Sequence, residues 1–114
     1  MRFARLRESP FDSDSIHPAL DVTVTSLEAE LETGNPFSQQ YAAKRLGWFG
    51  PAALQAVPAL FEALKVEYLR REAIEALGKI GPPARAAIPA LVALQNEALV
   101  GIYAKDALSK IRGN

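Results

Sequence analysis

The sequence predicts an all-α protein, a short α-solenoid of antiparallel helical hairpins with about two full repeats plus flanking half-repeats. The main observation is an internal repeat: segment 42–60 returns 31 residues later as 73–91, with ten of nineteen positions identical. Within each copy the apolar residues follow helical spacing, and glycine and proline recur at the same places. Self-similarity at a period of about 20–50 residues is the signature of stacked helical units.

The first helix of each unit is predicted from one apolar stripe per copy. Asn35 and Pro36 resemble an N-cap and a first-turn proline, so they predict where the first complete unit begins. Gly50-Pro51 and Gly81-Pro82 predict helix ends, with each glycine in a left-handed conformation of positive φ. The stripes comprise Ser38, Ala42, Leu46 and Phe49 in one copy, and Leu69, Ala73, Leu77 and Ile80 in the other.

The second helix of each unit is predicted from Pro58 and Pro89. A proline inside a helix costs about 3 kcal/mol, so both fit best in a first turn, after short helical turns at 51–56 and 82–87. Upstream, Val24, Leu27 and Leu31 match positions of the second helix at a shift of 33 residues, which predicts a lone second helix. Downstream, residues 98–112 match a first helix, which makes the third unit a half-unit.

Spacing also predicts the packing. Leu46, Leu77 and Leu108 are one period apart, and we expect them to stack between neighbouring units, whereas Gly47 and Gly78 lie inside helices and favour close helix approach. Three further residues are spaced one period apart, and we expect them to form a second buried column at the beginnings of the first helices. They are Phe37, Tyr68 and Leu99.

The residues Glu72-Ala-Ile-Glu-Ala-Leu-Gly-Lys-Ile-Gly81, followed by Pro-Ala-Leu, resemble the short HEAT-like repeat named after phycobilisome lyases. The resemblance covers roughly residues 35–112. It implies stacked helical hairpins whose second helices line a concave side. Because proteins of this family include adaptors, scaffolds and bilin lyases, the resemblance predicts the fold more sharply than the function.

Composition is consistent with one soluble domain. The chain is 49% hydrophobic, has a formal net charge of +0 and contains no cysteine, which is compatible with the cytoplasm and excludes disulfides and thiolate metal sites. No stretch is apolar enough for a membrane span, and no secretory signal is predicted at the N-terminus. We expect residues 1–14 to form an N-terminal segment, flexible or packed on the solenoid, and 15–114 to form the HEAT-like repeat domain.

Catalytic patterns are nearly missing. The only histidine, His17, has no oriented partner, and Glu72 and Glu75 resemble a solvated helix surface. The glycines of Gly47-Trp48-Phe49-Gly50 recur in the next unit, so they are packing and capping residues and not a phosphate loop. We therefore predict that the protein is not an enzyme and has no cofactor or metal.

The predicted function is protein binding as an adaptor or scaffold. On the second-helix side, the residues expected to face a partner are Gln55, Glu62, Lys65, Ala93 and Asn96. Tyr41 and Trp48 are either interface anchors or covered by residues 1–20, and the sequence leaves both readings open.

The C-terminal helix carries more apolar surface than one preceding neighbour can cover. Ile102 and Tyr103 are therefore expected to contact a partner or a second copy in a symmetric homodimer; the alternative is an adequately covered helix. Two other functions are compatible with the fold. A bilin lyase or chaperone-like subunit would need a second subunit or more repeats to enclose its ligand. Nucleic-acid binding would use Lys44, Arg45, Lys79, Lys105 and Lys110, but interleaved acidic residues make it a weak prediction.

Overall fold

The computed structural model describes residues 13–113, and of residues 13–22 it describes the backbone alone. This part of the chain consists of helices and turns. The α-helices are α2 (Ser13–Thr33), α3 (Pro36–Phe49), α4 (Val57–Ala63), α5 (Arg70–Ile80), α6 (Ile88–Leu94) and α7 (Gly101–Arg112), and the 3-10 segments are η1 (Gly50–Ala56), η2 (Glu67–Leu69) and η3 (Pro82–Ala87).

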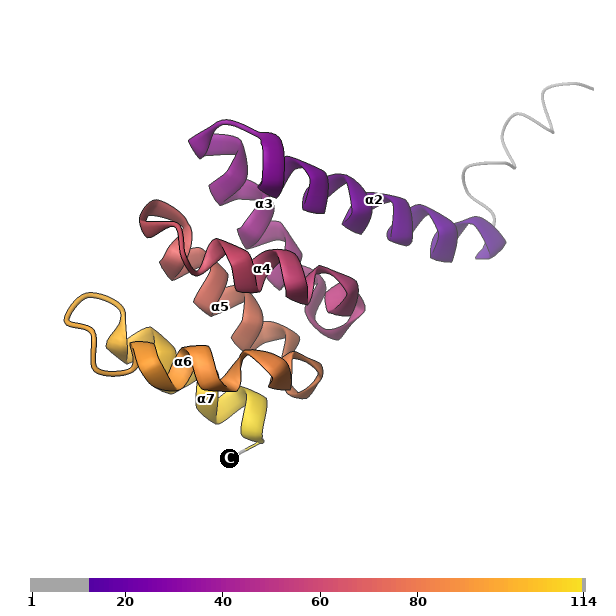
Figure 1. Cartoon of the computed structure of the whole chain (residues 1–114). Helices are drawn as coiled ribbons and strands as arrows, with labels where there is room; N and C mark the ends of the chain where they lie inside the picture. Colours follow the sequence, from indigo (N-terminus) through magenta and orange to yellow (C-terminus); the bar gives the residue numbers. More distant parts are fainter. Residues whose placement is uncertain (1–12, 114) are drawn as a thin grey trace, which may run out of the picture.

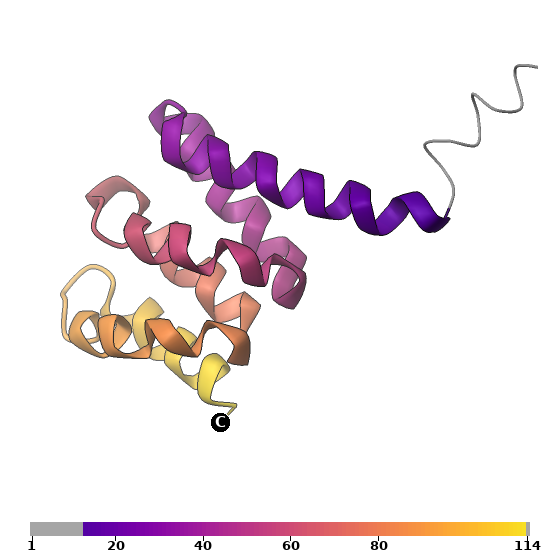
Figure 2. The ribbon, with the colours of Figure 1, turned by 45° about the vertical axis from the view of Figure 1, so that its right-hand side comes forward.

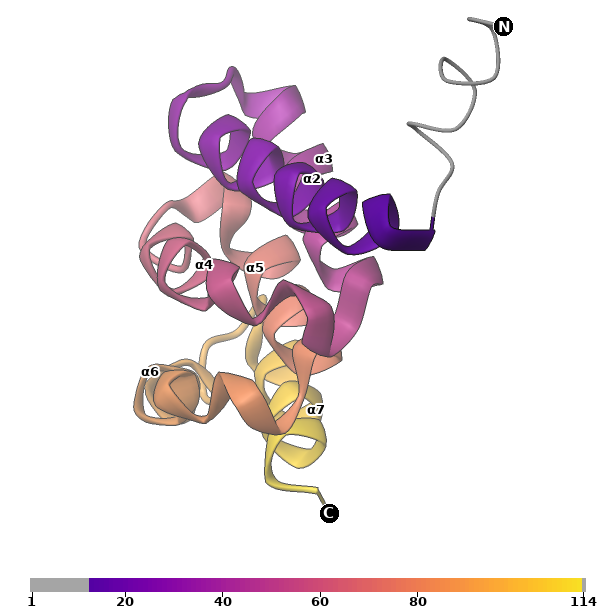
Figure 3. The ribbon, with the colours of Figure 1, turned by 90° about the vertical axis from the view of Figure 1, so that its right-hand side faces the viewer.

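The helices form two rows (Figure 1). One row, called here the first-helix row, contains α3, α5 and α7, and the other, the second-helix row, contains α2, α4 and α6. A view from the side separates α4 and α6 on one face from α5 and α7 on the other (Figure 3). The prediction of a short all-α solenoid with flanking half-repeats is therefore confirmed.

The upstream second helix is present as α2, where Val24 and Leu31 are buried and Leu27 packs against the core. Its N-terminal end extends past the other helices (Figure 2). The expected N-terminal segment 1–14 lies outside the described residues except for Ser13 and Asp14, which begin α2.

Glycine at the ends of α3 and α5 permits the sharp turn toward the second helix. Gly50 has φ 61° and Gly81 has φ 81°, so the predicted positive φ is confirmed. The expected left-handed helical conformation is wrong, because ψ is −140° at Gly50 and −145° at Gly81. This region of positive φ and extended ψ is open to glycine almost exclusively, so it is more restrictive than a left-handed cap.

The prolines begin the second helices as predicted. Pro58 and Pro89 each lie in the first turn, of α4 and α6 respectively, where the missing N–H would have no intrahelical acceptor. The short turns that precede them are the 3-10 segments η1 and η3. Proline thus marks where the chain stops turning and starts the return helix.

The core lies between the rows and follows the repeat. Leu46 and Leu77 are fully buried and Leu108 nearly so, in agreement with the predicted column. The first helices approach closely at the glycines. A Cβ placed on Gly47 would lie 2.9 Å from Cα of Ala76, and one on Gly78 would lie 3.0 Å from Cα of Ala107. Close helix approach at these glycines is confirmed.

The second predicted column is wrong, because its members are exposed. Phe37 is 83% exposed, Leu99 83% and Tyr68 46%. Period-31 spacing shows that three residues occupy equivalent places, but it does not say whether the place is inside or outside. The structure puts all three at or just before the beginning of a first helix.

Helix α7 begins later than the expected residue 98. Residues 98–100 form a turn, and the Gly101 amide donates a hydrogen bond of 2.8 Å to the Glu97 carbonyl. A Cβ on Gly101 would meet the Gln95 carbonyl oxygen, so the turn folds back onto this residue. The close fold-back at Gly101 explains the shorter helix.

The start of α3 provides a direct test of a cap. The Asn35 side-chain oxygen accepts a hydrogen bond of 3.0 Å from the Ser38 amide, so this side chain satisfies a backbone group that the helix cannot. Replacing Asn35 with alanine is expected to lower the free energy of unfolding by about 1 kcal/mol in urea denaturation. Asn96→Ala, in an exposed turn, is the control and should change it by less than about 0.5 kcal/mol. Equal effects would contradict the cap.

Candidate functional site

An apolar groove runs between two neighbours of the second-helix row, α4 and α6. This second-helix groove encloses about 250 Å³. Four of its side chains are buried or half-buried and pack on the core, so the groove has an apolar wall; they are Phe61, Leu64, Ala90 and Leu94. The lining residues are Phe61, Leu64, Lys65, Arg70, Ala90, Ala93 and Leu94.

Both charged residues that line the second-helix groove are cations. The Arg70 guanidinium is held in place because its Nε donates a 2.8 Å hydrogen bond to the Leu64 carbonyl. Lys65 lies 3.1 Å from the Glu62 carboxylate, but both side chains are about two-thirds exposed, and an exposed pair of this kind contributes little stability. The Lys65 ammonium therefore remains available to an incoming carboxylate.

The residues predicted for the second-helix side are all exposed, but they do not form one site. Lys65 and Ala93 meet in the groove, with Glu62 beside Lys65. Asn96 lies in the turn after α6. Gln55 is already engaged, because its side-chain amide donates hydrogen bonds of 3.1 Å to Thr25 and 2.8 Å to Glu28 of α2.

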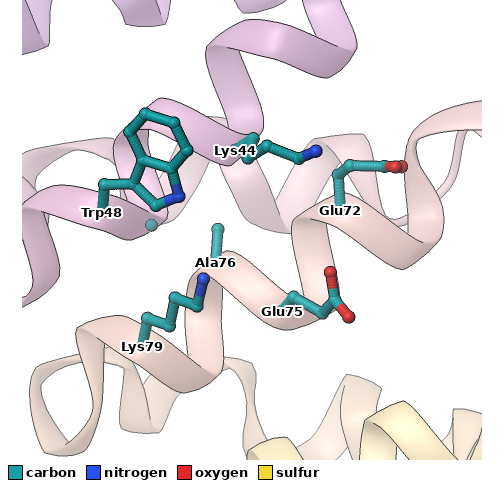
Figure 4. Close-up of a pocket in the computed structure, with 7 residues that line it drawn as sticks. Lys44, Trp48, Glu72, Glu75, Ala76 and Lys79 are labelled. Carbon is teal, nitrogen blue, oxygen red and sulfur yellow. The ribbon is translucent and has the colours of Figure 1, made fainter.

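A second depression, the first-helix hollow, lies between α3 and α5 and encloses about 280 Å³ (Figure 4). Its floor is made by Gly47 and Ala76, where the two helices approach. Long side chains stand around this floor because the residues at the crossing are small. They are Lys44, Trp48, Glu72, Glu75 and Lys79.

The first-helix hollow is lined by charges of both signs. Glu75 lies 3.9 Å from Arg71 of its own helix, whereas Lys44, Glu72 and Lys79 form no ion pair within 4.0 Å among the described residues. Figure 4 shows Lys44 on the same side as Glu72, and Lys79 on the same side as Trp48. The hollow thus offers both signs of charge, and no base paired with a nucleophile.

An aromatic stripe of Tyr41, Arg45 and Trp48 runs along the free side of α3. The Arg45 guanidinium lies 5.5 Å from both ring centroids, and it donates a 2.7 Å hydrogen bond to the Tyr41 hydroxyl. Tyr41 is nevertheless 54% exposed and Trp48 61% exposed. The reading that residues 1–20 cover them falls largely outside the described residues, so it stays a prediction.

The structure separates the two residues predicted on α7. Ile102 is 73% exposed, whereas Tyr103 is partly buried against the core, with the Arg71 guanidinium of α5 5.0 Å from its ring centroid. Of this pair, Ile102 is the one that remains free for a contact.

The basic residues considered for nucleic acid do not form a continuous track. Lys110 pairs with Asp106 at 3.0 Å, and Glu72 and Glu75 line the same hollow as Lys44 and Lys79 (Figure 4). Binding to a nucleic-acid backbone requires a continuous row of cations that matches the row of phosphates. Carboxylates within that row repel the phosphates. This surface therefore does not favour nucleic acid.

The described residues hold no group of three or more His, Cys, Asp and Glu side chains that could bind a metal ion. The side chain of His17 lies outside the description. No helix among residues 13–113 is both long and apolar enough to cross a membrane.

Sequence reasoning missed the apolar wall of the second-helix groove and the role of Arg45. Phe61, Leu64 and Leu94 were visible only as apolar residues of second helices, and periodicity alone assigns such residues to the core. Arg45 gave a stronger signal, because alanine occupies the equivalent positions 76 and 107. Alanine at this position lets the neighbouring first helix approach closely. An arginine there indicates that no helix packs closely on that side of α3.

Comparison with known proteins agrees with this architecture. A family model described as HEAT repeats matches residues 24–112, which is most of the chain. No curated protein and no solved structure matches it significantly.

Proposed function

The chain belongs to the HEAT-repeat family, and from this premise we propose that it is an adaptor or scaffold that binds another protein through its helical surface. The observation that carries the proposal is the second-helix groove, an apolar trough with Lys65 and Arg70 at its margin. This groove suits a partner segment in which an apolar side chain lies next to a carboxylate. We propose that the protein acts without catalysis, in the cytoplasm.

The short repeat supports a finer placement within the family. The period of 31 residues is below the ~40–47 of long HEAT repeats, and Ala-Leu-Gly with Pro-Ala-Leu recurs in order. These features favour the short, phycobilisome lyase-type repeat. These features describe the architecture of the repeat and do not indicate lyase activity.

Groove binding is supported by the energetics of apolar contacts. A side chain of leucine size that leaves water for such a groove gains about 1.5–3 kcal/mol, and a fixed guanidinium adds orientation through a hydrogen-bonded carboxylate. Because Arg70 is already held by the Leu64 carbonyl, little side-chain freedom is lost when a partner binds.

The test is affinity capture from the source organism with the intact chain and two variants. Ala93→Arg places a long cation in the groove, and Ala86→Arg places the same side chain on an exposed position of η3, away from the groove lining. We expect the wild type and Ala86→Arg to retain the same partner, and Ala93→Arg to lose at least about tenfold in affinity, or 1.4 kcal/mol. A partner that binds all three proteins equally would place the binding surface elsewhere.

A further inference from the structure

The two rows of helices do not begin and end together. In the described chain the second-helix row starts one position earlier, with α2, and the first-helix row finishes one position later, with α7. Helix α2 packs on α3 and α7 packs on α6, but no described first helix precedes α2 and no described second helix follows α7. Each end of the described chain is therefore half of a unit: a second helix, α2, at one end and a first helix, α7, at the other.

The internal contacts define which faces dock along the first-helix row. In α5 the docking face toward α3 contains Glu72, Ala76 and Lys79. In α7 the equivalent face toward α5 contains Tyr103, Ala107 and Lys110. Counting back one period puts Tyr41, Arg45 and Trp48 of α3 in the same place. The aromatic stripe is thus a docking face with no described helix in front of it.

The opposite face also repeats. Residues Gln40, Lys44 and Gly47 of α3 correspond to Arg71, Glu75 and Gly78 of α5, of which Arg71 and Gly78 contact α7. In α7 the same positions are taken by Ile102, Asp106 and Ser109, and no described helix follows. Ile102 is the most exposed apolar residue within the helices of this row apart from Phe37. This face would be covered in the interior of a longer solenoid.

We propose that a second copy of the chain fills this position, with α7 of one copy packed in front of α3 of the next. In this head-to-tail arrangement the face of Ile102 and Asp106 meets the stripe of Tyr41, Arg45 and Trp48. The same contact brings α7 of the first copy beside α2 of the second, so the two half-units together make one complete hairpin.

Charge complementarity supports this choice of occupant. Helix α2 carries Asp14, Asp21, Glu28, Glu30 and Glu32 and has no lysine or arginine. Helix α7 carries Lys105, Lys110 and Arg112 against Asp106 alone. At the equivalent of Lys105 the earlier units have Ala43 and Ile74, which are fully buried. A cation replaces these apolar residues in the helix that would stand next to acidic α2.

The side-chain sizes at the contact indicate a wider spacing than inside the chain. Arg45 replaces Ala76, and Ser109 replaces Gly78, so the two helices cannot approach as α3 and α5 do. A wider gap leaves room for Arg45, whose guanidinium is held over both rings, to reach the carboxylate of Asp106, which within one chain lies 3.0 Å from Lys110 of its own helix. An ion pair at an interface sets orientation and partner choice more than affinity.

Such a contact is heterologous, because two different faces meet, and it does not close on itself after two copies. A symmetric dimer through α7 would instead bury Ile102 against Ile102 and leave α3 free. The two arrangements therefore differ in which residues they need. Neither arrangement of the copies uses the second-helix groove. Binding of a partner in that groove is therefore tested separately, by Ala93→Arg.

Charge exchange across the contact tests the proposal with the full-length protein. Arg45→Glu and Asp106→Arg each put like charges face to face, and a one-to-one mixture of the two variants restores opposite charges. Sedimentation velocity over a concentration series should show wild-type mass rising beyond a dimer. Each variant alone should need at least about tenfold more protein to associate, and the mixture should associate as the wild type does. Arg85→Glu, on exposed η3, is the matched control and should behave as the wild type.

Trp48 adds a local signal because it is the only tryptophan. In the wild type its emission should shift to the blue as concentration rises, and in Asp106→Arg, altered two helices away, it should not. Unchanged melting midpoints would show that the variants are folded. A wild type that stays monomeric up to its solubility limit, a dimer that is indifferent to Arg45→Glu, or a mixture that fails to associate would overturn the proposal. A Trp48 emission that is equally blue-shifted at every concentration would also overturn the proposal, because the ring would then be covered within a single chain.

Discussion

Replacing Leu77 with alanine is expected to lower the free energy of unfolding by about 2–5 kcal/mol. Leu77 is fully buried in α5, the first helix that has a neighbour of its own row on both sides. Truncation removes apolar contacts and leaves a cavity that two packed helices cannot close. Because small domains are stable by only about 5–15 kcal/mol, a loss of this size is a large share of the total.

The matched control is two residues away on the opposite face of the same helix. The Glu75 side chain is 40% exposed and its nearest cation, Arg71, lies 3.9 Å away. Glu75→Ala should therefore change the free energy of unfolding by less than about 0.5 kcal/mol. Urea denaturation followed by circular dichroism measures both variants. Equal midpoints would show that the faces of α5 have been assigned wrongly.

The internal repeat made most of the fold predictable, because each residue can be compared with the residue at the equivalent position of the next unit. Pro58 and Pro89 located the second helices, and Gly47 and Gly78 located the close helix crossings. The same comparison failed for Phe37, Tyr68 and Leu99. Equivalent residues share an environment, but only contacts between units decide whether that environment is buried.

The candidate surfaces were less predictable, since they depend on what neighbouring helices leave uncovered. Gln55 was expected to face a partner, yet α2 lies close enough to take both of its hydrogen bonds. The second-helix groove arises from the gap between α4 and α6, and no single helix contains that information. Exposure along α3 could have been read from Arg45, because alanine stands at this place in both later units.

Replacing Gly81 with asparagine is expected to lower the free energy of unfolding by about 1–3 kcal/mol, although the space around it is open. A Cβ on Gly81 would meet nothing within 4 Å, so the cost is one of backbone conformation alone. With φ 81° and ψ −145° the residue lies outside the left-handed helical region that asparagine tolerates.

Gly113 provides the control that separates these two kinds of positive φ. Its φ of 82° and ψ of 20° are left-handed, and a Cβ there also meets nothing within 4 Å. Asparagine is accepted in this conformation at helix ends, so Gly113→Asn should change the free energy of unfolding by less than about 0.5 kcal/mol. Thermal and urea denaturation of both variants give the comparison. If Gly113→Asn destabilised the protein as much as Gly81→Asn, the special demand for glycine at the turn between α5 and α6 would be refuted. If only Gly81→Asn is destabilising, the Gly-Pro pair is required by the sharp turn that returns each first helix to the second-helix row.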